Sequence, residues 1–317
     1  MRAVIALLLG AVVSATSAQD YPTKAVTVIV PFPAGGPTDQ VARVLAAKFS
    51  EKLGQPFVVE NVSGGNTIIA TGRLARATPD GYTLLVHNLQ ITANPGLYGS
   101  KLPYDTEREI TPVGFINHNP LVLVGRKALP PDTLPELIAY MRKTSINFAH
   151  PGAGTTGYIT TALFLQQAKL DAVLVPYRGA APALQDMVGE HVDLFFTTPQ
   201  SVLPLIHAGK IKAYGITAKE PYAQFPGVAS FVDQYGPKLE IQYWHALFAP
   251  AATPKAVIDT LVKGLNDVLP DPTIQERSKA LGMEMRAGTP AEMDKRMKDD
   301  IAKWGAVIEK AGIEKRD

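Results

Sequence analysis

The stretch from Val26 to Asp39, VTVIVPFPAGGPTD, contains in order a strand, a glycine-rich turn and the start of a helix. Its first five residues are all β-branched and four of them are apolar, as in a buried strand. Gly35 and Gly36 allow a tight turn, and Pro37 suits the first position of a helix. A strand that passes through such a turn into a helix is the beginning of an α/β unit.

A second stretch, INFAHPGAGTTGYITTALF from Ile146 to Phe164, has the same layout. Gly152, Gly154 and Gly157 fit the G-x-G-x-x-G spacing of a dinucleotide-binding turn. Free backbone N–H groups at such a helix start can bind any anion, because no cationic side chain is required. An ordinary tight turn with helix capping explains either stretch equally well when it is taken alone.

Strand-like and helical patterns alternate along most of the 317 residues, which indicates two α/β domains with largely parallel sheets. The expected strands cover residues 26–30, 57–59, 82–86, 121–124, 146–149, 172–176, 193–196, 212–216 and 246–249. The expected helices cover residues 37–53, 66–77, 134–142, 155–167 and 181–188, then one that begins at Thr253-Pro254 and one over 290–308.

The C-terminal helices could pack back on the first sheet, so that the chain crosses between the domains twice. We therefore expect domain 1 to comprise residues 19–120 and 245–317, and domain 2 to comprise residues 121–244. Residues 1–18 have the pattern of a cleaved signal peptide, with Arg2, a short apolar run and small residues up to Ala18. The apolar run is shorter than the roughly 20 residues that a membrane-spanning helix needs. We therefore expect the protein to be exported.

Composition excludes several kinds of function. The net charge of +2 comes without a basic block, so nucleic-acid binding is not expected. The absence of cysteine excludes thiol nucleophiles and thiolate metal sites, and the six histidines lack metal-ligand spacing. No catalytic motif such as G-x-S-x-G or a phosphate loop is present. We therefore expect neither an enzyme nor a bound cofactor or metal.

A nicotinamide-dependent oxidoreductase that uses Gly152, Gly154 and Gly157 is the alternative. The dinucleotide-binding pattern includes an acidic residue about 20 residues after the glycine-rich turn. Tyr177 and Arg178 stand there instead. Arg178 could fit a 2′-phosphate, but an exported protein is a poor place for a soluble nicotinamide.

Four motifs carry a resemblance to a known family. They are VTVIVPFPAGGPTDQVAR (26–43), ENVSGG (60–65), ATPDGYTLL (77–85) and VPYRGAAPALQDMVGEHVD (175–193). In this order, and with the export signal, they resemble the Bug receptors, the periplasmic solute-binding proteins of tripartite tricarboxylate transporters. The resemblance implies a hinged periplasmic-binding-protein fold that closes on an organic carboxylate in a cleft between the domains, a periplasmic location and a membrane permease as partner. We expect a monomer.

The resemblance also implies a site in which two glycine-rich loops hold one carboxylate. Carried over by position, the loops supply Phe32, Pro33, Ala34, Gly35, Gly36, Gly154, Thr155 and Thr156. Three segments depart from the usual family pattern: the glycine run in residues 61–66 is shorter, Tyr158-Ile159 stands where His-Leu is common, and residues 87–90 (HNLQ) stand where small polar residues are usual. The last two segments lie near the expected cleft and supply the candidates Tyr158, His87 and Asn88; a buried structural role for His87 is the alternative. Further candidate contacts are Tyr177, Arg178, Phe196 and Trp244.

Aromatic residues near this cleft would suit a rigid apolar ligand body between polar ends. The expected ligand is a carboxylate with such a body, for example an aromatic dicarboxylate such as a phthalate isomer. A small aliphatic acid bound through water is the alternative, with most of the rings in the core. A sensor that presents its ligand to a signalling receptor would have the same binding core and stays open as a third function.

Overall fold

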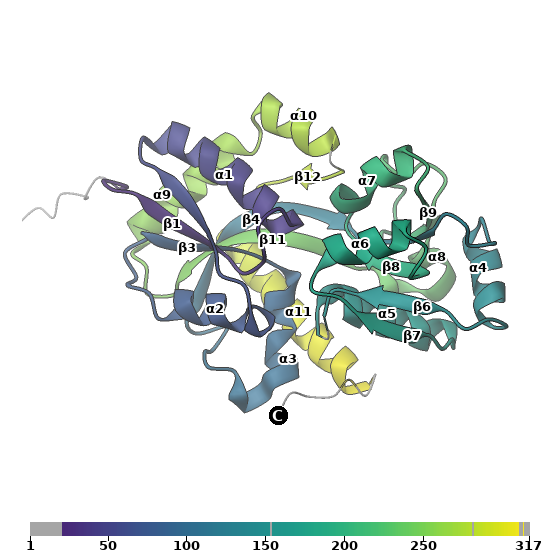
Figure 1. Cartoon of the computed structure of the whole chain (residues 1–317). Coiled ribbons are helices and arrows are strands. Elements are labelled where there is room, and N and C mark those ends of the chain that lie inside the picture. The colour runs from purple at the N-terminus through teal and green to yellow at the C-terminus, as the bar shows by residue number, and fades with distance from the viewer. Residues whose placement is uncertain (1–20, 153, 281, 311–312, 314–317) are drawn as a thin grey trace, which may run out of the picture.

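The computed structural model describes residues 21–152, 154–280, 282–310 and residue 313. The expected signal peptide, residues 1–18, lies outside the described residues. The chain forms two lobes that lie side by side, and each contains one six-stranded sheet (Figure 1). This arrangement confirms the predicted two-domain α/β fold.

The first lobe has the strand order β12-β4-β11-β3-β1-β2. Its strands are β1 (Val26–Val30), β2 (Phe57–Asn61), β3 (Thr83–Asn88), β4 (Ile110–Pro120), β11 (Gln242–Pro250) and β12 (Glu284–Met285). Its helices are α1 (Pro37–Leu53), α2 (Ile68–Ala75), α3 (Asn94–Tyr98), α9 (Lys255–Val268), α10 (Pro272–Ala280) and α11 (Pro290–Lys310). The short 3-10 turns η1 (Gly65–Thr67), η2 (Leu89–Thr92) and η3 (Gly99–Lys101) join them.

The second lobe has the strand order β10-β9-β5-β8-β6-β7. Its strands are β5 (Val122–Arg126), β6 (Asn147–His150), β7 (Val173–Pro176), β8 (Leu194–Thr197), β9 (Ile211–Ile216) and β10 (Ala229–Ser230). Its helices are α4 (Leu134–Met141), α5 (Thr156–Ala168), α6 (Ala180–Val188), α7 (Pro199–His207) and α8 (Phe231–Tyr235), followed by the turn η4 (Pro237–Leu239).

The central strands are apolar on both sides because helices cover both faces of the first sheet. Val28 and Val30 of β1 lie in one cluster with Leu45 of α1 and Leu261 of α9. Ile29, between them, points to the other face and belongs to the cluster that contains residues of α2 and α11. Successive side chains of a strand alternate between faces, so a strand buried on both sides shows a continuous apolar run.

The chain crosses between the lobes twice, and one buried threonine joins the two crossings. Only Leu121 separates β4 from β5. The hydroxyl of Thr217 accepts a hydrogen bond from the amide of Leu121 (2.8 Å) and donates one to the carbonyl of Ile241 (2.6 Å). Since β11 begins at Gln242 and belongs to the first sheet, we propose that the second boundary lies near residue 241 rather than 244.

The expectation of largely parallel sheets is wrong for the strands at the crossings. In the first sheet β11 pairs antiparallel with β3 and β4, and in the second β5 pairs antiparallel with β8 and β9. The cause is the connection itself: the outgoing strand β4 and the returning strand β11 run in opposite directions between the lobes. Parallel pairing persists where β-α-β units occur, for example between β1 and β3.

The last helix, α11, contacts both lobes. It packs on β4 and α3 of the first lobe, as expected for a C-terminal helix that returns to the first sheet, and it also contacts α5 (Figure 1). The side-chain amide of Gln166 in α5 donates to the carbonyl of Lys310 (3.3 Å). Trp304 and Ile308 of this helix belong to a buried cluster that includes residues of both lobes.

Candidate functional site

A cleft of about 550 Å³ lies between the two lobes. Its volume falls within the range of small-molecule sites. The first lobe contributes the loop between β1 and α1 together with residues of β3 and η2. The second contributes the segments that follow β6, β7 and β8. The lining residues are Phe32, Pro33, Ala34, Gly35, Gly36, Pro37, Thr38, Gln40, Asn88, Gln90, Leu121, Pro151, Thr155, Thr156, Gly157, Arg178, Gly179, Ala180, Ala181, Pro182, Leu184, Phe195, Phe196, Thr197, Thr198, Gln200, Ser201 and Tyr243.

Four helices begin at this cleft. The N-cap residues of α1, α5, α6 and α7 are Gly36, Thr155, Gly179 and Thr198, and all four line it. Figure 1 shows the N-terminal end of α1 at the junction of the lobes, next to α6. Each helix N-terminus carries unpaired N–H groups and a partial positive charge of about half an elementary charge. Among the described lining residues there is no acidic side chain, and Arg178 is the one cation. The cleft is built for an anion.

Asp39 fixes the shape of the first glycine-rich loop. Its carboxylate accepts hydrogen bonds from the amide of Gly35 (2.8 Å), from Nε of Arg43 (2.9 Å) and from Nδ2 of Asn61 (2.9 Å). Burial acts to raise the pKa of Asp39, but these hydrogen bonds outweigh it and hold that pKa below its usual value. The amide of Gly35 is therefore occupied within the protein. Gly35 has a φ of 82°, in the left-handed region, so glycine is needed there for the turn.

The amides that remain for a ligand belong to the first turns of the helices. Thr38 lies in the first turn of α1, and Thr156 and Gly157 are the first residues of α5. At these positions an α-helix offers its N–H groups no acceptor of its own. All three residues line the cleft, so an anion in the cleft can accept hydrogen bonds from amides of both lobes.

A buried polar network behind the cleft holds Thr38. Nδ1 of His245 lies 2.8 Å from Oδ1 of Asn117, which can only accept, so this nitrogen carries the proton. Nε2 of His245 therefore accepts from the hydroxyl of Thr38 (3.1 Å), and Nδ2 of Asn88 donates to the same hydroxyl oxygen (3.2 Å). Burial lowers the pKa of His245 to about 3, which keeps the ring neutral.

The second loop is closed by Thr155. The hydroxyl of Thr155 donates to the carbonyl of Gly152 (2.7 Å) and accepts from the amide of Tyr158 (3.3 Å), which caps α5. Gly154 has a φ of 83° and touches the first lobe: a Cβ there would lie 2.5 Å from Cδ1 of Leu97. This glycine is a contact between the lobes rather than a part of the cleft wall.

Ten of the fifteen candidate residues line the cleft, and their role in binding stays a prediction. They are Phe32, Pro33, Ala34, Gly35, Gly36, Asn88, Thr155, Thr156, Arg178 and Phe196. Five others do not line it, namely His87, Gly154, Tyr158, Tyr177 and Trp244.

The positions of these five have local causes. His87 is completely buried behind the wall, where its Nδ1 accepts from the amide of Asn88 (2.7 Å) and its ring meets Phe32 edge-on. Burial lowers the pKa of His87 to about 3, in line with the structural alternative for this residue. Trp244 points to the opposite face of β11, where its Nε1 donates to Asp300 (2.8 Å). Tyr158 packs edge-on against His150, and the hydroxyl of Tyr177 donates to Asp186 (2.8 Å).

Sequence reasoning missed the contribution of α7. Thr198 and Pro199 after β8 are a cap followed by proline at the first helical position, the same signature that identified the helix after Thr253. Pro204 inside the helix interrupts the pattern. Gln200 and Ser201 of this helix line the cleft.

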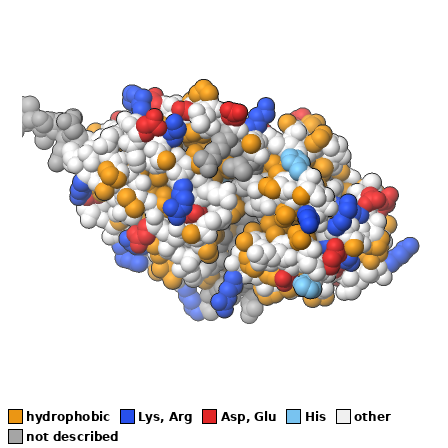
Figure 2. All heavy atoms as spheres, turned by 45° about the horizontal axis from the view of Figure 1, so that its top comes forward, with side chains coloured by type: hydrophobic (Ala, Val, Ile, Leu, Met, Phe, Trp, Pro, Cys, Tyr) orange, Lys and Arg blue, Asp and Glu red, His pale blue; other side chains and the backbone are white. Residues whose placement is uncertain are grey.

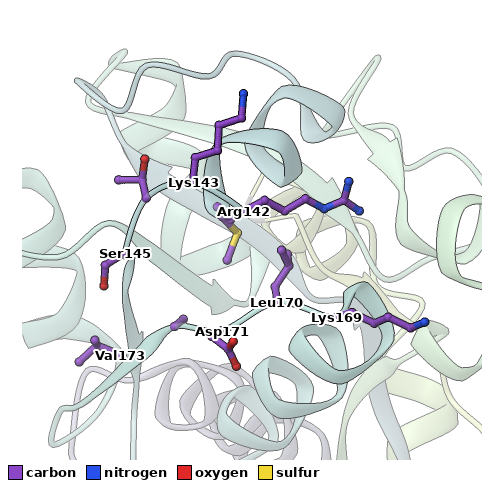
Figure 3. A pocket seen from close by; sticks show the side chains of 10 residues that line it. Arg142, Lys143, Ser145, Lys169, Leu170, Asp171 and Val173 are labelled. Carbon is purple, nitrogen blue, oxygen red and sulfur yellow. The ribbon is translucent and has the colours of Figure 1, made fainter.

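A second cavity, of about 510 Å³, lies where α4 and α5 end. Figure 3 shows Arg142, Lys143 and Lys169 around it; Lys143 points upward in this view, whereas Arg142 and Lys169 point to the right with their charged ends apart. Arg142 and Lys169 are the C-cap residues of the two helices, where a cation is favourable beside the negative end of the helix dipole. Helix capping explains these charges, and they do not converge on a common point.

Charges elsewhere are mixed. Figure 2 shows lysine and arginine interspersed with aspartate and glutamate over the face it presents, with no large block of one sign. Within the described ranges, no cluster of histidine and acidic side chains has the geometry to hold a metal ion. None of the helices in the described part of the chain combines the length and the apolar character required to span a membrane.

The fold and the cleft define a two-lobed binding protein for an anionic solute. Residues 41–313 match the family model of the tripartite tricarboxylate transporter family receptor. The chain belongs to this family, and it is accordingly a solute-binding receptor rather than an enzyme. The oxidoreductase alternative is not supported.

A protein of known sequence and one of known structure are similar to this chain over nearly its whole length. A protein of Agrobacterium vitis, the UPF0065 protein in the TAR-I ttuE-ttuC′ intergenic region, is 35% identical over 97% of this chain and 91% of its own length. The structure of periplasmic binding protein BugD is 34% identical, with a TM-score of 0.86 over 93% of this chain and 100% of that one.

Two further structures contain a ligand. Rpa4515 of R. palustris with adipate is 31% identical, with a TM-score of 0.87 over 93% of this chain and 99% of that one. MatC of Rhodopseudomonas palustris with bound malate is 33% identical, with a TM-score of 0.83 over 91% of this chain and 100% of that one.

Proposed function

We propose that this protein is an exported receptor that captures an organic carboxylate between its lobes and delivers it to a membrane permease. The observation that carries the proposal is the convergence of four helix N-termini on one cleft whose described lining residues include no acidic side chain. Two similar proteins are solved with adipate and with malate, both carboxylates.

The available hydrogen bonds suffice for the affinity of a receptor. A hydrogen bond to a charged group contributes about 1.5–3 kcal/mol net. The amides of Thr38, Thr156 and Gly157 therefore approach the roughly 8 kcal/mol of a micromolar complex before the cost of closing the cleft. Backbone donors lose no side-chain entropy on binding, which favours this design over a lysine or arginine.

The apolar part of the wall supports a ligand with an apolar body. Leu121, Leu184, Phe195, Phe196 and Tyr243 line the cleft beside the polar loops. We propose a carboxylate with a body of this kind, and an aromatic dicarboxylate such as a phthalate isomer remains our specific expectation. An aliphatic acid such as adipate is the competing ligand.

A thermal-shift panel tests the binding proposal. The panel contains succinate, malate, adipate, citrate, benzoate and the phthalate isomers, with adipamide as an uncharged control. A ligand at a hundred times its dissociation constant stabilises a protein by about 2.7 kcal/mol, a readily measured shift. Stabilisation by at least one acid and none by adipamide supports the proposal. Stabilisation by aliphatic acids alone would rule out the aromatic ligand. If no acid stabilised the protein, the proposal of a carboxylate receptor would be overturned.

Export, the permease and the monomeric state are part of the same proposal. The predicted signal peptide and the periplasmic name of the similar protein BugD support export. Fractionation of the host cell, size-exclusion chromatography and uptake of the labelled acid test the three points in turn. Uptake that needs both this receptor and a permease supports transport, whereas a transcriptional response that survives loss of the permease would favour the sensor.

A further inference from the structure

Gln200 is a buried polar side chain of the cleft whose amide is unused. The residue is 6% exposed and lines the cleft at the second position of α7. Neither Oε1 nor Nε2 has a hydrogen-bond partner in the part of the chain that the structure describes. A buried amide without partners destabilises the folded state, and native proteins rarely keep one without a reason.

The other buried amides of the cleft are occupied. Nε2 of Gln90 donates to Oδ1 of Asn66 (2.6 Å). The side chain of Asn88 donates to Thr38 (3.2 Å) and accepts from the amide of Gln90 (2.9 Å). Gln200 differs because it lines the cleft while both polar atoms of its amide are buried without a hydrogen-bond partner among the described residues.

We propose that Gln200 selects ligands that carry, besides the carboxylate, a neutral group that both donates and accepts a hydrogen bond, namely a hydroxyl or a carboxamide. The inference rests on the proposed function and narrows its ligand class to acids that carry such a group, in preference to a plain dicarboxylate such as a phthalate isomer.

The pairing follows from the two halves of the amide. Nε2 donates and Oε1 accepts, so a hydroxyl or carboxamide satisfies both atoms at once. A bare carboxylate can only accept, which leaves Oε1 buried and unpaired. A site built to hydrogen-bond a substrate group discriminates strongly against the analogue that lacks it.

The surroundings of Gln200 favour such a neutral group. Thr197 and Thr198 are nearly buried beside it, and the hydroxyls of Thr198 and Ser201 lie 3.2 Å apart. No acidic side chain lines the cleft among the described residues, and the one cation, Arg178, is exposed. The side chains that line the cleft at α7 are thus neutral and polar, and a second full charge there would meet the partial positive charge of the α7 N-terminus but no charged side chain of this helix.

Gln200→Met tests the assignment, because methionine keeps the length of the side chain and its helix propensity but removes both polar atoms. Gln90→Met is the matched control, since Gln90 lines the same cleft with its amide engaged. The first measurement is the melting temperature of ligand-free protein, prepared by unfolding, dialysis and refolding. We expect Gln200→Met to raise it by about 2 °C or more and Gln90→Met to lower it. A lower melting temperature for both would show that the amide of Gln200 has a structural partner and would overturn the proposal.

The second measurement is calorimetric affinity for matched pairs, malate against succinate and adipic acid monoamide against adipate. The wild type should prefer the substituted member of at least one pair by about tenfold or more. Gln200→Met should reduce that ratio to about one while it still binds the unsubstituted acid. A wild type that binds acids without preference, or a ratio unchanged in Gln200→Met, overturns the role of Gln200 and leaves the receptor function intact. A wild type that binds none of the acids overturns both.

Discussion

Nε2 of His245 accepts a hydrogen bond from the hydroxyl of Thr38, with the two atoms 3.1 Å apart and both residues buried. His245 belongs to β11, the strand by which the chain returns from the second lobe, and Thr38 lies in the first turn of α1 at the cleft. The bond therefore connects the returning strand to the glycine-rich loop at the cleft, and Nε2 can accept it only while the ring is neutral.

Acid should weaken the folded protein through His245 and His87. Burial lowers the pKa of each ring to about 3, whereas the unfolded chain takes up these protons near 6.5. The unfolding free energy must therefore fall as pH drops from 6.5 toward 3, by about 1.4 kcal/mol per pH unit for each histidine. Urea unfolding at pH 7 and pH 5 measures this loss, which we expect to be about 2 kcal/mol per histidine.

His245→Gln supplies the control for that measurement. The variant removes one of the two completely buried rings, so its loss of stability between pH 7 and pH 5 should be smaller than that of the wild type by about 2 kcal/mol. His207→Gln, at an exposed position, should leave the loss unchanged. An equal loss in His245→Gln and wild type would show that other groups cause the acid sensitivity.

The α/β units could be predicted from sequence because their local patterns agree with the fold. The run Val26–Val30, the glycines after it and Pro37 all specify strand, turn and helix within 14 residues. The pairing of β4 with β11 could not be predicted, because these strands are more than 120 residues apart and β4 contains proline, glycine and asparagine. Their antiparallel direction depends on the path between the lobes.

Which side of a strand faces the cleft could not be predicted from the sequence either. In β11, Tyr243 lines the cleft and Trp244 faces the core, yet both are aromatic and both are buried. A strand buried on both faces carries no polar alternation to set its orientation. The same holds for His87 and Asn88 in β3, of which only Asn88 reaches the cleft.

Trp244→Phe should destabilise the protein without changing ligand affinity. The variant removes the hydrogen bond from Nε1 to Asp300 (2.8 Å) and leaves this buried carboxylate with Arg296 as its remaining side-chain partner. We expect a loss of about 2 kcal/mol in the free energy of unfolding. Trp304→Phe is the matched control, since Trp304 is also buried but its Nε1 has no hydrogen-bond partner among the described residues. A larger loss for Trp304→Phe, or weaker binding by Trp244→Phe, would contradict this assignment.

Asp39→Ala should impair both stability and binding. The side chain of Asp39 is 3% exposed and accepts from Gly35, Arg43 and Asn61, so its removal leaves donors unpaired and frees the first loop. We expect a loss of about 2 kcal/mol in stability and at least tenfold in affinity for whichever acid the panel identifies. Asp259→Ala breaks an exposed ion pair with Lys255 and should change neither. Unaltered affinity in Asp39→Ala would mean that the shape of this loop does not govern binding.

Gly154→Ala should hinder the approach of the lobes, because the new Cβ would lie 2.5 Å from Cδ1 of Leu97 in the other lobe. Gly236→Ala is the control for backbone strain: Gly236 is not a lining residue of the cleft and has a similar φ of 82°, against 83° for Gly154, but a Cβ there meets nothing within 4 Å. Both variants suffer the left-handed conformation, and only Gly154→Ala adds the clash. Ligand affinity should therefore fall further in Gly154→Ala, and the compaction that X-ray scattering detects on ligand binding should be smaller. Leu97→Ala in the Gly154→Ala background should restore part of the affinity, since it removes the clashing methyl group. If the double variant binds no better than Gly154→Ala, strain in the loop rather than contact between Leu97 and Gly154 limits closure.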